Sequence, residues 1–334
     1  MNNFSVITGK SIDKWLSGNT DVLIKTVSDT YKCFSERKIV NPDSYFLRFN
    51  NEPTNRIIAL PAAIEDATRA VGIKWISSFP DNINHNLNRA SAVIILNDRD
   101  NGYPIACLEG SLISVARTAA SAALGAIHLH PTPGQIKHLV IVGGGPISFN
   151  TLVLLKKLKW NIDKITIIDS DRERAKLFAE KNHQSDVQFS QDSEKIRNAD
   201  MIIFATSAIT PYIVDHKMFL HHPTVLHLSL RDIAPSIIIE SQNFADDIDH
   251  ALKANTSVHL AEIQTGHRKF MSGTLVDVIN GNVLIDKSKT RIFSPFGMGC
   301  LDMAVAKRIY DDINRSEIYT VDDFFPQPYA CSAN

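Results

Sequence analysis

Hydrophobic and polar positions along the chain follow two patterns, one before and one after about residue 118. The first begins with a helical pattern from Ser11 to Glu36, after which short strand-like runs alternate with turn residues. The predicted strands are Ser44–Asn50, Arg56–Leu60, Val71–Ser77, Ala92–Asn97 and Tyr103–Leu108. A helical opening followed by short strands predicts an α+β domain.

The second pattern is a regular alternation of apolar strands and helices. Strands are predicted at Lys137–Val142, Lys164–Ile168, Met201–Ala205, Val225–Leu228 and Arg291–Phe293, with helices at Phe149–Leu158 and Arg172–Lys181. Apolar strands that alternate with helices are typical of a parallel sheet covered on both faces. We therefore predict a doubly wound α/β domain over residues 119–298. A helix of mostly small residues, 110–124, precedes this domain, and a helix at Leu301–Asn314 follows it.

A glycine-rich turn follows the first of these strands. Gly143-x-Gly145-x-x-Ser148 is a dinucleotide-binding fingerprint whose third glycine is replaced by serine. Gly143 permits a tight turn, and Gly145 lets the backbone approach a pyrophosphate. The N-terminus of the following helix, entered through Pro146 and Ile147, would hold that pyrophosphate. Ser148 is expected only to loosen helix–sheet packing, so the turn still predicts a Rossmann-type site.

The next strand ends in Asp169, which bears on the choice of dinucleotide. A carboxylate at this place accepts hydrogen bonds from ribose hydroxyls and repels a 2′-phosphate, so it favours NAD. Arg172 and Arg174 keep NADP open as the alternative, because an arginine just past the strand can pair with a 2′-phosphate.

Two further loops follow predicted parallel strands, where open α/β sheets bind their ligands. Thr206, Ser207 and Ala208 are placed for cofactor contact, with an ordinary turn as the alternative. Asp232 is a candidate general base or ammonium ligand, and it is equally suited to capping a helix that starts at Pro235. The sequence leaves these alternatives open.

Cations gather in the first domain. Lys74 lies in an apolar strand and Arg117 in the middle of the small-residue helix. A buried cation costs free energy unless an anion pairs with it, and a substrate carboxylate would be such an anion. A solvated lysine on a surface strand is the alternative for Lys74. Arg48, Arg56 and Arg89 are further candidates for substrate carboxylates, with a solvated or salt-bridged position as the alternative for the first two.

Composition narrows the classes of partner. The 334 residues are 44% hydrophobic, and 35 basic side chains stand against 36 acidic ones, a net charge of −1. Without a positive field, nucleic acid and membrane surfaces are unsuitable partners. The sequence has no uninterrupted run of about 18 apolar residues, and its first 20 residues do not resemble a secretory leader, so we expect a cytoplasmic location.

Neither a metal site nor a disulfide framework is predicted. The cysteines lie far apart and are expected to be reduced thiols: Cys33, Cys107, Cys300 and Cys331. The neighbouring histidines lack a third ligand at a fixed spacing and are expected in loops: His128, His130, His221 and His222. Asp246, Asp247 and Asp249 are expected to form a solvated edge.

Several motifs together resemble the ornithine cyclodeaminase/mu-crystallin family over nearly the whole chain. They are Gly72-Ile73-Lys74-Trp75, Asn88–Asp98, Tyr103-Pro104-Ile105-Ala106 and Arg117-Thr118-Ala119-Ala120. The segment Arg89–Ser91 and the turn Pro295–Gly299 are most similar to family members that oxidise N-(2-amino-2-carboxyethyl)-L-glutamate with NAD. Such members release L-2,3-diaminopropionate and 2-oxoglutarate for siderophore or peptide-antibiotic synthesis. Ornithine or lysine cyclodeamination, or mu-crystallin-like NAD(P)H-dependent ketimine reduction, are the alternatives.

The resemblance also implies an architecture and residue roles. The α+β domain would be discontinuous, 1–118 with 299–334, and would bind the substrate and form a homodimer, while 119–298 would bind NAD. Arg48, Lys74 and Arg117 would meet substrate carboxylates or the reacting carbon, and Asp232 would be the catalytic acid/base. Further cofactor contacts would fall on Ser91, Arg117, Thr118, Met298 and Gly299.

Departures from the family pattern bear on the substrate. The segment Ser229–Ala234 lacks the glycine-rich sequence and the downstream lysine usual in cyclodeaminases, which weakens that alternative. A small amino-acid substrate with three carboxylates suits Arg48, Arg89 and Arg117, one guanidinium for each. Either Asp232 or Lys74 would accept the proton of the reacting amine.

Overall fold

The chain divides into two compact units that interleave in sequence. The computed structural model describes residues 3–181, 187–190 and 193–326, so the predicted thiol of Cys331 lies outside the described residues. Unit 1 comprises Met1–Arg117 with Met298–Asn334, and unit 2 comprises Thr118–Gly297. Each junction lies one residue before the boundary expected from the sequence, and the first falls inside one helix, α3 (Ser111–Leu129).

Unit 1 is built on an eight-stranded mixed sheet. The strands follow the order β16-β1-β7-β6-β5-β4-β2, with β3 also paired to β4; β1 and β7 are parallel, and the other neighbours are antiparallel. The strands are β1 (Phe4–Ile7), β2 (Ile39–Val40), β3 (Tyr45–Phe49), β4 (Glu52–Ile64), β5 (Val71–Ser78), β6 (Ala90–Asn97), β7 (Pro104–Glu109) and β16 (Tyr319–Val321). All five predicted strands are present, and β4 extends beyond the predicted one at both ends.

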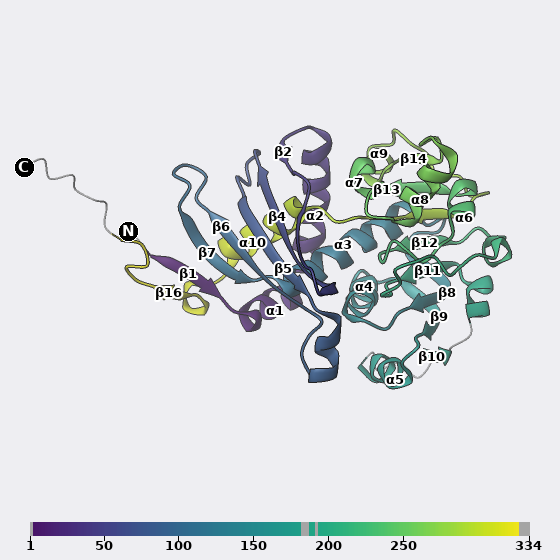
Figure 1. Cartoon of the computed structure of the whole chain (residues 1–334), viewed down its shortest axis with the longest axis horizontal. Helices are drawn as coiled ribbons and strands as arrows, with labels where there is room; N and C mark the ends of the chain where they lie inside the picture. The colour runs from purple at the N-terminus through teal and green to yellow at the C-terminus, as the bar shows by residue number, and fades with distance from the viewer. Residues whose placement is uncertain (1–2, 182–186, 191–192, 327–334) are drawn as a thin grey trace, which may run out of the picture. The chain divides into compact units, whose positions relative to one another are not determined.

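Helices cover one face of this sheet. The helix α10 (Gly299–Asp312) packs across β4, β5 and β6 and against α2 (Thr20–Ser35) (Figure 1). The single helix expected from Ser11 to Glu36 is two helices, α1 (Gly9–Gly18) and α2, because Asn19 takes a non-helical conformation with φ −124° and ψ 42°. Short 3₁₀ turns complete the unit: η1 (Pro80–His85) and η4 (Arg315–Glu317).

Unit 2 is a Rossmann-type, doubly wound sheet, as predicted. Its eight strands are parallel neighbours in the order β10-β9-β8-β11-β12-β15-β13-β14. They are β8 (Gln135–Val142), β9 (Asn161–Ile168), β10 (Val187–Ser190), β11 (Met201–Phe204), β12 (Thr224–His227), β13 (Gln242–Ala245), β14 (Met271–Thr274) and β15 (Arg291–Phe293). The chain order reverses between β8 and β11, and ligands of such sheets bind beside the carboxyl ends of the strands at that point.

The helices of unit 2 connect these strands. They are α4 (Pro146–Lys157), α5 (Arg172–Lys181), η2 (Ser193–Asn198), η3 (His216–Phe219), α6 (Pro235–Glu240), α7 (Ile248–Ala251), α8 (Ser257–Thr265) and α9 (Leu275–Ile279). Buried apolar residues of the strands form the core beneath them, among them Val140, Phe204, Val225 and Ile292. This core fixes the loops at the carboxyl ends of β8, β11 and β12.

Two expectations about polar residues of unit 2 are wrong. Asp246 is buried and not a solvated edge, because it accepts the backbone N–H groups of Phe296 and Gly297 at 2.9 and 2.6 Å. His128 lies within α3 and not in a loop. His130, just after α3, is in a loop as expected but is buried, with its ring nitrogens 3.1 Å from Thr224 Oγ1 and the Gln135 carbonyl. The side chains of Asp246 and His130 therefore hold loops in place.

The helix α3 is long and apolar enough, by length and composition alone, to cross a membrane. In the structure 67% of that helix window is buried inside the protein. Its small residues permit this burial, and Ala119, Ala120, Ala122 and Ala123 are fully covered. Such burial is typical of the core helix of a folded protein.

Candidate functional site

The two cations predicted to need an anion meet the same buried carboxylate in unit 1. Lys74 on β5 donates to Asp302 Oδ2 at 2.5 Å, and Arg117 Nε on α3 donates to Asp302 Oδ1 at 3.2 Å. Lys74 Nζ also donates to Ser114 Oγ at 3.2 Å. Asp302, which no sequence pattern pointed to, is fully buried, and Lys74 is 1% exposed. The protein itself therefore supplies an anion where only a substrate carboxylate was expected.

The cluster of Lys74, Arg117, Ser114 and Asp302 brings two cations to one carboxylate. Burial lowers the pKa of Lys74 to about 8, and the charge of Arg117 acts in the same direction, whereas the charge of Asp302 opposes it. An ammonium group that titrates near neutrality can either bind a carboxylate or accept a proton.

Strand register decides which of the other predicted cations share the face of Lys74. Arg48 pairs with Arg56 across β3 and β4, and Arg56 pairs with Ser78 across β4 and β5. Because side chains alternate along a strand, Arg48 and Arg56 project on the same face of the sheet as Lys74. Arg48 is exposed, with its guanidinium carbon 5.1 Å from the Phe46 ring centroid. Arg89 is half-buried immediately before β6.

Three residues predicted to contact a cofactor have other partners in unit 1. Ser91 is exposed on the face opposite Lys74, where its hydroxyl lies 2.8 Å from Ser77 Oγ. Met298 is buried at the N-cap of α10. A side chain on Gly299 would approach the Leu60 carbonyl oxygen to 3.2 Å, so this glycine permits close packing of α10 on β4. Their cofactor contacts, and that of the half-buried Thr118 on α3, stay predictions.

The glycine turn of unit 2 has the geometry that a pyrophosphate requires. Gly143 has φ +96°, and a Cβ there would lie 2.4 Å from the Ala205 carbonyl oxygen, so the tight turn needs glycine. A Cβ on Gly145 would meet nothing within 4 Å. The helix α4 begins at Pro146 with Gly145 as N-cap and no side-chain cap. The first N–H groups of α4, beginning at Ile147, thus fit an anion such as a pyrophosphate.

Ser148 does more than the expected loosening of packing. Its buried hydroxyl hydrogen-bonds to the carbonyl oxygens of Gly143 and Gly145, at 2.5 and 3.0 Å. A glycine at this position would make neither bond. The serine therefore ties the turn to the first turn of α4.

Asp169 is buried at the end of β9 and holds the same turn. Its Oδ2 accepts the Gly144 N–H at 2.7 Å, and its Oδ1 accepts the Asp171 N–H at 2.9 Å. Each carboxylate oxygen has a second lone pair, so both can still accept a hydroxyl. The guanidinium of Arg174 lies 3.4 Å from Asp171 and 3.9 Å from Asp169, so it already has two carboxylate partners.

Asp232 lies in a polar cluster at the carboxyl ends of β11 and β12. Its carboxylate accepts hydrogen bonds from the hydroxyls of Thr206 and Ser229, and His227 Nε2 lies 3.2 Å from its Oδ2. Asp232 is fully buried, and the N-cap of α6 is Ala234, so the capping alternative is wrong. Thr206 joins this cluster and also accepts the Ala208 N–H at 3.1 Å, whereas Ser207 is exposed.

The electrostatics of this cluster favour ionised Asp232. Burial acts to raise the pKa of the carboxyl, but the hydrogen bond and charge of His227, with the hydroxyls of Ser229 and Thr206, lower it below its ordinary value. Burial and the charge of Asp232 raise the pKa of the neighbouring Tyr212. His227 was read from the sequence only as part of a strand, because nothing in that strand marks its contact with Asp232.

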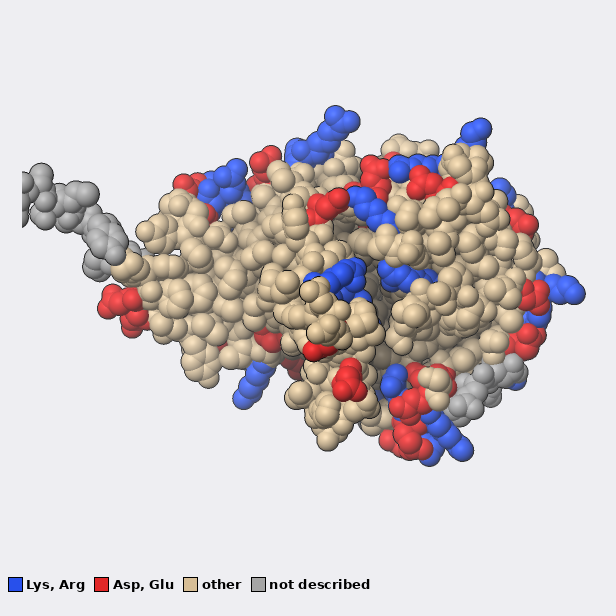
Figure 2. All heavy atoms as spheres, viewed as in Figure 1, with Lys and Arg blue, Asp and Glu red and all other residues tan. Residues whose placement is uncertain are grey.

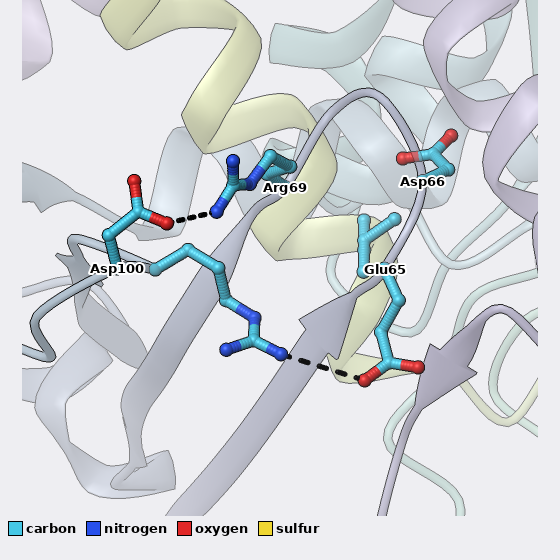
Figure 3. A pocket seen from close by; sticks show the side chains of 6 residues that line it. Glu65, Asp66, Arg69 and Asp100 are labelled. Atoms are coloured by element: carbon cyan, nitrogen blue, oxygen red, sulfur yellow. Dashed lines mark hydrogen bonds and ion pairs between the residues drawn. The ribbon is translucent and has the colours of Figure 1, made fainter.

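A separate hollow in unit 1 lies at the turns after β4 and β6. Figure 3 shows Arg69 pointing to Asp100, with which it forms an ion pair, and Arg99 lies 3.8 Å from Glu65 across the hollow. Each guanidinium already has a carboxylate partner, and none of the predicted site residues lines this hollow. Among the described residues, no group of His, Cys, Asp and Glu could hold a metal ion.

Comparisons with known proteins show the family of the chain. The family model of the ornithine cyclodeaminase/mu-crystallin family matches residues 16–317. The chain is 27% identical to N-((2S)-2-amino-2-carboxyethyl)-L-glutamate dehydrogenase of Staphylococcus aureus, over 96% of this chain and 98% of that protein.

Solved structures share the whole fold. Δ1-pyrroline-2-carboxylate reductase of Thermococcus litoralis, in complex with NADH and L-proline, has a TM-score of 0.84 at 20% identity over 92% of this chain and 97% of that one. An archaeal alanine dehydrogenase dimer with bound NAD has a TM-score of 0.80 at 19% identity over 92% and 95%. From the match over residues 16–317, the chain belongs to the ornithine cyclodeaminase/mu-crystallin family.

Proposed function

We propose that the protein is an NAD-dependent dehydrogenase that oxidises the CH–NH bond of N-(2-amino-2-carboxyethyl)-L-glutamate, releasing L-2,3-diaminopropionate and 2-oxoglutarate. The relative from Staphylococcus aureus is named for this substrate and is similar over nearly the whole chain. The observation that carries the proposal is the buried cluster at Asp302, where Lys74 and Arg117 come together as a pair of cations suited to carboxylate groups. Arg48 and Arg56 on the same sheet face offer guanidinium groups for the others.

The residues of unit 2 fit a dinucleotide, and NAD in particular. The N-terminus of α4 and the open space at Gly145 would hold the pyrophosphate, and Asp169 would accept the ribose hydroxyls. Arg174 faces two carboxylates, which disfavours a role in binding a 2′-phosphate. When bound, NAD supplies the hydride acceptor for the reacting carbon.

Side chains of the protein would bind the substrate carboxylates and accept the proton of the reacting amine. Arg117 and Lys74, which share Asp302 as a partner, would bind substrate carboxylates. Asp232 would accept the proton of the secondary amine, whose lone pair must be free before hydride leaves the neighbouring carbon. Of the two candidate bases, Asp232 is favoured, since Lys74 already donates to both Asp302 and Ser114.

A second candidate is reduction of a cyclic imine. Δ1-pyrroline-2-carboxylate reductase of Bacillus cereus is 24% identical over 88% of this chain. That substrate has one carboxylate and would need one cation of the cluster. The reduction of the imine consumes NADH, whereas the proposed oxidation forms it, so one assay of NADH distinguishes the two candidate functions.

The test follows NADH at 340 nm with purified full-length protein. Net NADH formation from NAD and the glutamate conjugate is expected, with none from ornithine and no NADH consumption with Δ1-pyrroline-2-carboxylate. Arg117→Ala should abolish turnover, whereas Arg99→Ala, which removes a guanidinium from the separate hollow, should not. Absence of NADH with the conjugate would contradict the proposed substrate, and NADH consumption with the imine would favour the second candidate.

We also propose that the protein is a homodimer formed through unit 1. The sheet face opposite Lys74 carries a row of aligned residues, Tyr45, Ala59, Trp75 and Val93, on four neighbouring strands. Trp75 is 43% exposed and Tyr45 74% exposed, which is typical of an interaction surface when apolar residues adjoin. The archaeal alanine dehydrogenase of similar fold is a dimer. The cytoplasmic location and the siderophore or peptide-antibiotic pathway stay predictions.

A further inference from the structure

A histidine with no predicted role lies against Asp232. His227, the last residue of β12, is fully buried, and its Nε2 lies 3.2 Å from Asp232 Oδ2. The same Nε2 lies 3.2 Å from the backbone nitrogen of Asp232, whose N–H donates to it. The other ring nitrogen, Nδ1, lies 3.3 Å from the hydroxyl of Ser294 at the end of β15.

The two contacts at Nε2 belong to different protonation states. An unprotonated Nε2 accepts the Asp232 N–H, whereas a protonated Nε2 donates to the Asp232 carboxylate. In both states an Nδ1–H can donate to Ser294 Oγ. The neutral ring and the imidazolium therefore differ by one proton, and both ring nitrogens have a partner in each state, whereas the Asp232 N–H has Nε2 as its acceptor only in the neutral state.

We propose that His227 receives, through Asp232, the proton that the substrate amine gives up. This inference rests on the proposed function for the identity of the amine. An N–H bond of the substrate ammonium breaks as an O–H bond forms on Asp232. That O–H bond then breaks as the Nε2–H bond of His227 forms, which leaves an imidazolium beside a regenerated carboxylate. Water that then cleaves the C–N bond brings both protons that the departing amine takes up, so the proton on His227 is the one that the oxidation releases, and it leaves through Asp232 to solvent before the next turnover.

The surroundings of Asp232 explain why a second acceptor is needed. Hydrogen bonds from Thr206 and Ser229 stabilise the carboxylate, so a proton on Asp232 is short-lived near neutral pH. Imidazole is the side chain best suited to hold a proton there. The titratable groups that face the pair are Asp232 itself and Tyr212, while β11 contributes the Phe204 ring, centred 5.9 Å from the imidazole.

The first test needs no turnover. With ¹⁵N-labelled histidine in the full-length protein, the ring nitrogens of His227 should report both the Nδ1–H tautomer and the imidazolium while the protein stays folded. Asp232→Asn should lower the imidazolium fraction at a given pH, because an amide does not stabilise that cation. The ring of His130, buried in the same unit, is the control and should be unaffected by Asp232→Asn. A His227 ring that is always neutral, or an imidazolium fraction that Asp232→Asn leaves unchanged, would overturn the proposal.

The second test is kinetic. His227→Asn keeps a donor near Asp232 but cannot take up a proton, so kcat should fall by roughly 10²-fold, with loss of the acidic limb of the pH–rate profile and with NADH affinity retained. His130→Asn is the matched control and should keep the wild-type profile. Unchanged kcat and profile in His227→Asn would reject the relay. If the wild-type protein makes no NADH from the conjugate, the proposed function fails, and the ¹⁵N measurement decides the relay independently.

Discussion

Among single residues, Asp302 determines whether unit 1 can bury two cations. Replacing Asp302 by Leu would leave Lys74 and Arg117 buried without their anion, which typically costs about 3–5 kcal/mol. We expect Asp302→Leu to lower the free energy of unfolding by roughly that amount in urea titrations. Asp311→Leu, on the exposed part of the same helix, should cost less than about 1 kcal/mol. Equal effects of the two substitutions would contradict the role of the cluster.

The same cluster makes stability depend on pH through Lys74. Its pKa is about 8 in the folded protein against an ordinary value of 10.5, so between these values the unfolded chain binds more protons. The free energy of unfolding therefore rises with pH between about 8 and 10.5, and below this range the full cost of burying the ammonium group lowers the stability. Relative to Lys74→Met, the wild-type protein should gain stability from about pH 8 to 10 in urea titrations. A constant difference between the two proteins would show that Lys74 does not titrate there.

Among structural elements, the loop between β8 and α4 contains two glycines with different expected roles, Gly143 in stability and Gly145 in dinucleotide binding. Gly143→Ala should destabilise the protein by about 1–3 kcal/mol or more, because φ is +96° and the new Cβ would collide with the Ala205 carbonyl. Gly145→Ala should leave the melting temperature nearly unchanged, since its φ is −83° and the space is open. The methyl group would occupy the approach of the pyrophosphate, so NADH affinity should fall. Unchanged NADH affinity in Gly145→Ala, measured by fluorescence titration, would argue against this loop as the dinucleotide site.

Elements with a strong local pattern were predictable, and elements of mixed polar and apolar sequence were not. The helix α5 and the strand β15 have the predicted bounds, because apolar periodicity or flanking turns define them. The strands β10, β13 and β14 mix polar with apolar residues, and β14 reads Met-Ser-Gly-Thr, so no continuous apolar run marks them. Tertiary pairing alone defines them.

Site residues divide in the same way. The turn at Gly143 and Gly145 was found because its chemistry lies in consecutive residues. Asp302 was missed because it lies in an apolar helical run, and its partners precede it by 185 and 228 residues. Asp246 was misjudged for a similar reason, since the backbone groups it binds lie 50 and 51 residues later. Long-range partners leave no signal in a local pattern.

For the whole molecule, the nearly equal numbers of basic and acidic residues correspond to a surface on which the two signs are mixed. On the face shown in Figure 2, Lys and Arg side chains are interspersed with Asp and Glu, and no large area carries one sign. Two cations, Lys74 and Arg117, are instead gathered inside unit 1. Charge in such a place attracts a small anion and does not create a surface for a polyanion.

The apolar face of unit 1 predicts the assembly of the whole protein. Trp75 lies in the middle of the aligned row from Tyr45 to Val93, and a carboxylate there would be desolvated against a second copy without a partner. Trp75→Glu should therefore convert the dimer to a monomer, with half the mass in light scattering, while NADH binding by unit 2 is retained. Leu284→Glu replaces another apolar residue, 82% exposed in unit 2, and should leave the dimer intact. A monomeric wild-type protein would contradict the proposed dimer. A Trp75→Glu variant that stays dimeric would show that the dimer forms through another surface.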